Sequence, residues 1–212
     1  MNIAIFGASG KTGLLLTERC LERGYAITAL VRTPAKFPHR DRVRVVEGDA
    51  LDAAKVRESV ARSDVVLSAL GQRTLGHDQL LERALPLIVT AMQQAGSRRI
   101  IALGAAGTSP DAFKCQPAPL RWLIQGVFYR LVLKWPIASQ VAQWNLLAAS
   151  GLDWTIVMPP KLVNSPGRGR YCVYGNALPP YGLRISREDV ADFIIQQIGN
   201  PEWVGKGAYV SW

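Results

Sequence analysis

The chain has 212 residues, of which 49% are hydrophobic and 19% charged. This composition is typical of a globular protein with a large core and excludes a disordered or fibrous chain, and the length favours one domain over residues 1–212. The formal net charge of +9 is spread along the chain without a dense basic run, so we expect a basic surface that serves an anionic small molecule and no nucleic-acid partner.

Short apolar runs alternate with segments of helical periodicity along most of the chain. The apolar runs predict strands at 3–6, 26–31, 43–46, 65–70, 99–103 and 154–158. Helices are predicted at 14–21, 78–95 and 139–149. Because the strands are apolar throughout, they are typical of a parallel sheet that is buried on both faces. We therefore predict an α/β fold with a Rossmann-type doubly wound sheet.

The last part of the chain predicts one more helix and one more strand. The helix starts at Ser186 with a pattern like a capping box and ends before Gly199, and the strand at 208–210 is expected at the sheet edge. The segments 108–136 and 161–183 interrupt the alternation, and each follows the carboxyl end of a strand. Ligands bind at that edge of an open α/β sheet, so we expect these insertions to form a small substrate lobe.

A glycine-rich loop follows the first predicted strand and opens the first predicted helix. Gly7 permits a tight turn, Gly10 lets the backbone approach a pyrophosphate, and Gly13 allows the helix to pack closely on the strand. The free N–H groups and the dipole at the helix N-terminus attract phosphate. We predict that a dinucleotide pyrophosphate binds at Gly7, Ser9, Gly10, Lys11, Thr12 and Gly13.

The residues Gly10, Lys11 and Thr12 also resemble the end of a nucleoside-triphosphatase P-loop. That motif requires a further glycine at the position of Ile5. The sequence therefore excludes a P-loop here.

The residues after the second and third predicted strands indicate the nucleotide. Enzymes that prefer NAD carry an acidic residue at the end of the second strand, whereas this chain has Arg32 there and Lys36 a turn further on. A guanidinium pairs with a 2′-phosphate, so NADP(H) is the expected cofactor. Asp49, after the third strand, is either an acceptor for the adenine amino group or the cap of a following helix.

Several motifs are similar to one family. They are IAIFGASGKTG at 3–13, LVR at 30–32, EGD at 47–49, LSALG at 67–71, SGLDWTIVMPP at 150–160 and ISREDVA at 185–191. They resemble the atypical short-chain dehydrogenase/reductase family, and within it the single-domain NAD(P)H-binding flavin reductase (biliverdin reductase B) group. The resemblance covers nearly the whole chain. It implies that NADPH contacts Gly7, Gly10, Thr12, Arg32 and Lys36, with Leu70 and Gly71 alongside and Pro159 and Pro160 near the nicotinamide.

The chain departs from this family's pattern at polar positions. Relatives often carry a serine after the fifth strand and a histidine after the proline pair, where this chain has Ala105 and Lys161. The Tyr-x-x-x-Lys pair of the larger group is also missing, because Leu133 stands four residues after Tyr129. Alcohol oxidation needs a positioned base and is not expected.

Reduction of a conjugated acceptor needs no such base, because the acceptor spreads the charge and takes its proton from water. We expect an NADPH-dependent oxidoreductase that transfers hydride to a planar acceptor, namely a flavin, quinone or tetrapyrrole. The alternative is a redox sensor that binds NADP(H) without turnover. Lys161 is either a contact for the charge of the acceptor or a surface lysine.

The first insertion interleaves aromatic and basic side chains, namely Trp122, Phe128, Tyr129, Trp135, Arg121, Arg130 and Lys134. The aromatic residues pack a helix, offer a stacking surface to the acceptor, or contact an anionic membrane peripherally. The cations make an integral membrane segment at 119–137 unfavourable. A monomer and a small homo-oligomer are both compatible with the sequence.

Cysteine and histidine positions exclude other scaffolds. Cys20, Cys115 and Cys172 are widely spaced, which argues against disulfide or zinc frameworks and fits a reducing compartment. His39 and His77 lack the spacing of metal ligands, so no metal is expected. The first residues run into the glycine turn without the basic start of a signal peptide, and we expect a cytoplasmic protein.

Overall fold

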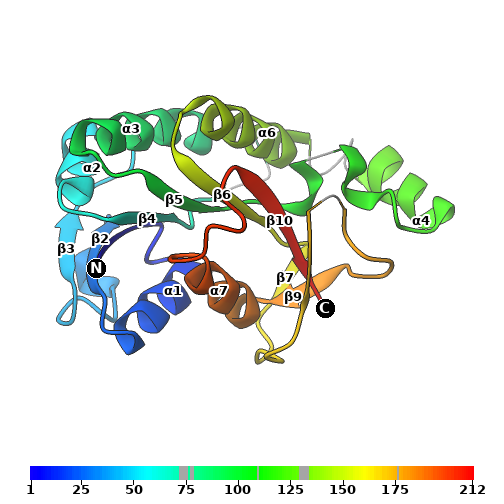
Figure 1. Ribbon diagram of the computed structural model, residues 1–212, viewed down its shortest axis with the longest axis horizontal. Coiled ribbons are helices and arrows are strands. Elements are labelled where there is room, and N and C mark those ends of the chain that lie inside the picture. Colours follow the sequence, from blue (N-terminus) through cyan, green and yellow to red (C-terminus); the bar gives the residue numbers. More distant parts are fainter. Residues whose placement is uncertain (72–75, 77–78, 109, 129–133, 176) are drawn as a thin grey trace.

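The computed structural model describes residues 1–71, 76, 79–108, 110–128, 134–175 and 177–212. Its centre is an eight-stranded sheet with the order β3-β2-β1-β4-β5-β6-β10-β8 (Figure 1). The strands pair in parallel except β8 (Cys172–Tyr174), which is antiparallel to β10 (Lys206–Ser211). The chain winds outward from β1 in both directions, which defines a doubly wound sheet. The predicted Rossmann-type α/β fold is confirmed.

The remaining strands of this sheet follow the apolar runs closely. They are β1 (Asn2–Phe6), β2 (Ala26–Val31), β3 (Arg44–Glu47), β4 (Val65–Ser68), β5 (Arg99–Leu103) and β6 (Asp153–Met158). β4 is buried along its whole length. It ends at Ser68 and not at 70 as predicted, because Ala69 and Leu70 leave the strand to line a cleft.

Helices cover both faces of the sheet, and each face has its own core (Figure 1). One face carries α2 (Ala53–Val60), α3 (Leu80–Ala95) and α6 (Lys134–Ala149), and the other carries α1 (Lys11–Glu22) and α7 (Arg187–Gln196). Leu85 and Ile88 of α3 are fully buried, as is Val190 of α7. Burying one such side chain contributes about 1.5–3 kcal/mol, so tertiary packing fixes these helices.

Several helix ends follow the predicted chemistry. Gly96 ends α3 in the left-handed conformation, with φ 72°. The Ser186 hydroxyl caps α7 by accepting a hydrogen bond from the Asp189 N–H. The described part of α6 starts at Lys134 and not at 139, and it includes Pro136. The predicted start of α3 at Asp78 lies outside the described residues.

Sequence periodicity did not reveal α2, β8 or a second, two-stranded parallel sheet of β7 (Lys161–Val163) and β9 (Arg184–Ser186). The position of the last strand was also predicted wrongly. β10 pairs with β6 and lies between β6 and β8, so β8 is the edge strand. Short strands without clear alternation leave little signal in a sequence.

The two insertions contact each other. The first contains η2 (Ala106–Thr108), η3 (Pro110–Phe113), α4 (Ala118–Trp122) and a π-helical stretch, η4 (Leu123–Phe128). The Leu178 N–H donates to the Ala112 carbonyl at 2.8 Å. The buried Gln116 side chain donates to the Pro179 carbonyl at 2.6 Å and accepts from the Tyr181 N–H at 2.9 Å. We call residues 106–128 and 161–183 together the insertion lobe.

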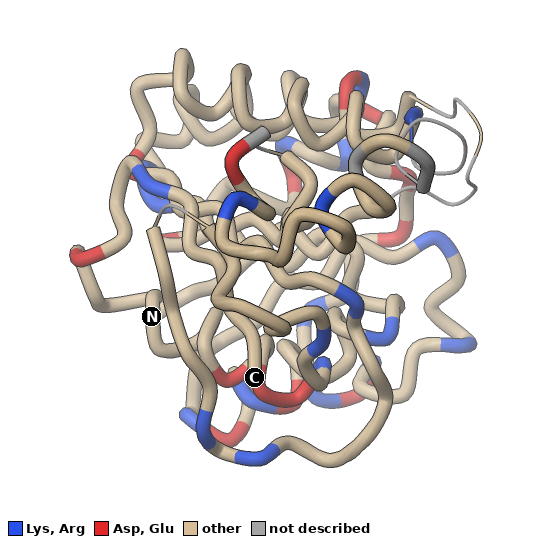
Figure 2. The backbone as a smooth tube through the Cα atoms, turned by 90° about the vertical axis from the view of Figure 1, so that its right-hand side faces the viewer, with Lys and Arg blue, Asp and Glu red and all other residues tan. Residues whose placement is uncertain are grey.

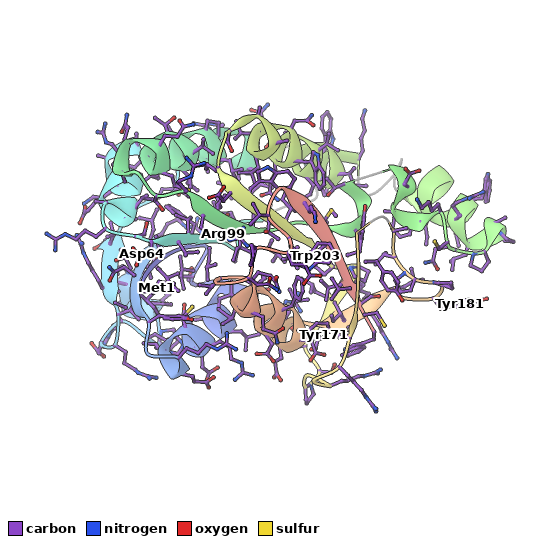
Figure 3. The ribbon with its side chains drawn as sticks, viewed as in Figure 1. Met1, Asp64, Arg99, Tyr171, Tyr181 and Trp203 are labelled. Atoms are coloured by element: carbon purple, nitrogen blue, oxygen red, sulfur yellow. The ribbon has the colours of Figure 1, made fainter. Side chains whose placement is uncertain are left out.

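The insertion lobe and the start of α6 carry exposed aromatic side chains. Trp122 is 69% exposed, so most of its side chain is open to solvent. Trp135, at the start of α6, is 40% exposed, and the Lys134 ammonium lies over its ring. Tyr181 lies at the same end of the molecule as α4 (Figures 1 and 3). The side chain of Phe128 and all of Tyr129 and Arg130 lie outside the described residues.

In the part of the chain that the structure describes, every helix is too short or too polar to cross a lipid bilayer.

Candidate functional site

The glycine loop joins β1 to α1 through a turn that requires glycine. Gly7 has φ +76°, and its carbonyl accepts a hydrogen bond from the Gly10 N–H at 3.0 Å. A Cβ atom on Gly7 would lie 2.7 Å from the Ala69 carbonyl oxygen. The loop can therefore approach the end of β4 only because position 7 has no side chain.

The other two glycines of the loop have different surroundings. A Cβ on Gly13, inside α1, would lie 2.0 Å from the Gly7 carbonyl oxygen, so the close packing predicted for Gly13 is present. A Cβ on Gly10 would meet only the Gly7 oxygen, at 3.2 Å. Gly10 is exposed, has ordinary extended backbone angles, and is the N-cap of α1 without a side-chain cap. The start of α1 is thus open to a ligand at Gly10.

A cleft of about 480 Å³ lies at the carboxyl ends of the first four strands. β1 lies between β2 and β4, and the chain winds away from it in opposite directions, which makes this the switch point where doubly wound sheets bind ligands. The predicted site residues that line the cleft are Gly7, Ser9, Gly10, Lys11, Thr12, Arg32, Asp49, Leu70 and Gly71.

Other predicted residues lie outside this lining. Lys36 is exposed on a short 3₁₀ turn, η1 (Pro34–Lys36). Pro159 and Pro160 follow β6 at the same edge of the sheet, and the Pro159 carbonyl accepts a hydrogen bond from the Ala106 N–H at 2.9 Å. Their contacts with a cofactor stay predictions, as does that of Gly13.

Asp49 is a cleft residue and not a helix cap. Its carboxylate accepts a hydrogen bond from the Leu51 N–H at 3.0 Å. The cap of α2 is Asp52, whose carboxylate accepts from the N–H groups of Ala54 and Lys55. The alternative that Asp49 caps the following helix is therefore wrong.

Lys161 opens β7, and its side chain is exposed. Its neighbour Leu162 lines the cleft. Successive side chains of a strand point to opposite faces, so Lys161 points away from the surface that Leu162 contributes. An acceptor contact for Lys161 stays a prediction.

The structure adds cleft residues that sequence reasoning missed, namely Phe6, Leu30, Val31, Gly48, Ala50, Ala69, Leu80, Leu162 and Arg187. Most of these are neighbours of predicted residues at the same strand ends. Leu162 adjoins Lys161 on β7, whereas Arg187 is distant in sequence from the other lining residues and comes to the cleft through the packing of α7 beside α1. Two signals were available for Arg187, because it opens a predicted helix and belongs to the motif ISREDVA at 185–191.

The charges of the cleft favour an anion. Lys11, Arg32 and Arg187 line it together with one carboxylate, that of Asp49. On the face seen in Figure 2, Lys and Arg residues are separated by acidic and uncharged segments and form no continuous band. The charged residues that line the cleft therefore present a net positive charge to a ligand.

The first turn of α7 also holds the loop at 167–169. The fully buried carboxylate of Asp189 accepts hydrogen bonds from the N–H groups of Arg168 and Gly169 and from the Trp212 indole, at 2.7–3.0 Å. Burial raises the pKa of Asp189, but these bonds and one from Ser186 outweigh it, so the pKa lies below its ordinary value. Further along α7, Tyr171 and Trp203 pack edge-on against Phe193.

Comparisons with known proteins agree with this geometry. A family model described as NAD(P)H-binding matches residues 7–201. The chain belongs to this NAD(P)H-binding family. The expected class of cofactor is thereby confirmed.

Individual relatives are distant. A probable pinoresinol-lariciresinol reductase of Arabidopsis thaliana is 26% identical over 99% of this chain and 67% of its own length. A short-chain dehydrogenase/reductase of Veillonella parvula, solved in complex with NADP, has a TM-score of 0.81 at 22% identity and covers 100% of this chain and 94% of its own. The anaerobilin reductase ChuY of Escherichia coli O157:H7 also has a TM-score of 0.81 at 22% identity, over 100% and 97% of the two chains. At this identity the structures show a shared fold.

Proposed function

We propose that the protein is an NADPH-dependent reductase that transfers hydride to a planar conjugated acceptor, namely a flavin, quinone or linear tetrapyrrole. The observation that carries the proposal is the cleft, with an uncapped helix N-terminus at Gly10 and Arg32 at the end of β2. Membership of the NAD(P)H-binding family supports a nicotinamide cofactor. The reductases among its relatives support reduction as the reaction.

In this proposal each part of the cleft has one task. The N–H groups at the start of α1 bind the pyrophosphate, and Arg32, aided by Lys36, pairs with the 2′-phosphate. Asp49 accepts from the adenine amino group, while Leu70 and Gly71 lie along the cofactor. Pro159 and Pro160 limit the space near the nicotinamide. NADPH, when bound, supplies the hydride.

The acceptor receives a hydride, that is, two electrons and one proton, and water supplies a second proton. Overall, NADPH, the acceptor and one proton give NADP⁺ and the reduced acceptor. Position 105, after β5, is an alanine and donates no proton. The ends of β5 and β6 therefore hold the acceptor by shape and proximity. Lys161 contributes a contact to the charge of the acceptor.

Nucleotide binding by two variants tests the cofactor assignment. Arg32→Ala removes a charge-assisted contact of about 1.5–3 kcal/mol, so the NADPH Kd rises about 10- to 150-fold while the NADH Kd is unchanged. Arg42→Ala removes the same charge from an exposed residue that does not line the cleft, and serves as control. Equal affinity of the unmodified protein for both nucleotides would contradict the assignment.

Turnover is tested with an acceptor panel of flavin mononucleotide, a short-chain quinone and biliverdin, followed by the loss of NADPH absorbance. Steady oxidation with at least one acceptor is expected. NADPH binding without turnover across all three classes would overturn the reductase and favour the redox sensor.

A further inference from the structure

Arg187 is a cleft residue to which the proposed function gives no task. It is the first residue of α7, and it lines the cleft together with Leu162 of β7. Its Nη1 atom donates to the Leu162 carbonyl at 3.4 Å and to Oδ1 of Asn164. Arg187 therefore connects the cleft to the start of the second insertion.

The packing of α7 places Arg187 on the opposite side of the glycine loop from Arg32. α7 lies beside α1 under the sheet (Figure 1). It precedes β10, which is parallel to β6, so α7 begins at the carboxyl edge of the sheet, as α1 does. In Figure 1, α7 lies on the side of α1 that faces β6 and β10, whereas β2, which Arg32 follows, and β3 lie on the other side.

The donors around this part of the cleft fit a phosphate. The start of α1 offers backbone N–H groups without a side-chain cap. Arg187 uses Nη1 for Leu162 and Asn164, and among the described residues its Nε and Nη2 have no acceptor. A planar guanidinium with such donors matches two oxygens of a phosphate.

We propose that Arg187 is a second binding residue for the pyrophosphate of the dinucleotide and that Asn164 positions it. The inference rests on the nucleotide site of the proposed function. The glycine loop contacts the pyrophosphate from one side and Arg187 from the other. Because Leu162 and Asn164 hold the same guanidinium, nucleotide binding also orders the start of the second insertion.

Ligand fragments separate this role from that of Arg32. ADP contains the pyrophosphate without a 2′-phosphate, and adenosine 2′-monophosphate contains the 2′-phosphate without a pyrophosphate. Arg187→Gln is expected to weaken NADPH, NADH and ADP alike, by about 10-fold or more, and to leave adenosine 2′-monophosphate unchanged. Arg184→Gln, an exposed arginine of β9 outside the cleft lining, is the matched control and is expected to bind all four ligands normally.

Two further variants keep the test decisive if Arg187→Gln does not fold. Arg187→Lys keeps the charge without the planar fork and is expected to weaken ADP about 3- to 10-fold. Asn164→Ala is expected to weaken ADP about 3-fold, again without an effect on adenosine 2′-monophosphate, a pattern that general destabilisation would not produce. ADP affinity equal to that of Arg184→Gln in these variants would overturn the role of Arg187 alone. Failure of the unmodified protein to bind either dinucleotide would overturn the proposed function instead.

Discussion

The cleft and the insertion lobe are built by different means. The glycine loop takes its shape from backbone contacts within a few residues, such as the bond from the Gly10 N–H to the Gly7 carbonyl. The insertion lobe depends on side chains that join distant segments, since Gln116 reaches Pro179, 63 residues away, and Asp189 holds Arg168. The glycine loop of the cleft is therefore encoded locally by residues without side chains, whereas the insertion lobe is encoded by pairings across the chain.

The largest effect is expected for Gly13→Ala in the locally encoded region. The new Cβ would lie 2.0 Å from the Gly7 carbonyl oxygen, and neither backbone can move without opening the loop. We expect a loss of more than about 4 kcal/mol in the free energy of unfolding, measured by urea denaturation. Gly10→Ala, in the same loop, is the control and should cost at most about 1 kcal/mol. Similar stability of the two variants would mean that the close contact at position 13 is not needed.

The next effect concerns the anchoring of the insertion lobe to α7. Asp189→Asn replaces an acceptor of several buried bonds and should cost about 3 kcal/mol. Glu188→Gln is the control, because the Glu188 carboxylate accepts one bond among the described residues, from the Gly167 N–H, and a glutamine keeps an acceptor oxygen. The pKa of Asp189 is lower in the folded than in the unfolded state, where it is about 3.9. The ionised carboxylate therefore adds its full contribution to the free energy of unfolding above that pH, and this contribution is lost as the pH falls through the lower folded pKa. The stability difference between Asp189→Asn and the unmodified protein should therefore shrink below about pH 4. A constant difference from pH 7 to pH 3 would contradict this role.

Gly10→Val separates binding from folding within the loop. The backbone angles at position 10 suit a branched residue, so the stability should change by at most about 1 kcal/mol. The side chain would fill the space proposed for the pyrophosphate, and the NADPH Kd should rise about 100-fold or more, which corresponds to about 2.7 kcal/mol. Calorimetric titration and thermal melting measure the two quantities. A folded variant with normal NADPH affinity would remove the basis of the nucleotide site.

The smallest effect is expected for Lys161→Ala, at the border of the two regions. The lysine is exposed and points away from the surface that Leu162 gives to the cleft. A contact made equally in the ground and transition states raises KM without lowering kcat, and we expect a rise of a few-fold in the KM for flavin mononucleotide. Loss of kcat by orders of magnitude, with acceptor binding intact, would make Lys161 a catalytic group.

Features that local sequence encodes could be predicted, and features that depend on contacts between distant segments could not. The strands β1 to β6, the glycine loop and Arg32 were predictable because each depends on a short stretch with strong local preferences. Arg187 was not, because its place depends on α7 packing beside α1, and nothing in the residues around position 187 encodes that neighbour. β10 was misplaced at the edge for a similar reason, since strand order depends on contacts between segments far apart in the sequence.

The position of β10 has a consequence for how the polypeptide assembles during synthesis. β1 to β4, with the glycine loop, pair with one another and leave the ribosome early. β6 and β8 both precede β10 in the chain and both pair with it, so neither pairing can form until residues 206–211 have been made. The nascent chain should therefore carry a protected nucleotide-binding half while β6 still presents an open edge, and this edge is where premature association with other chains is to be expected.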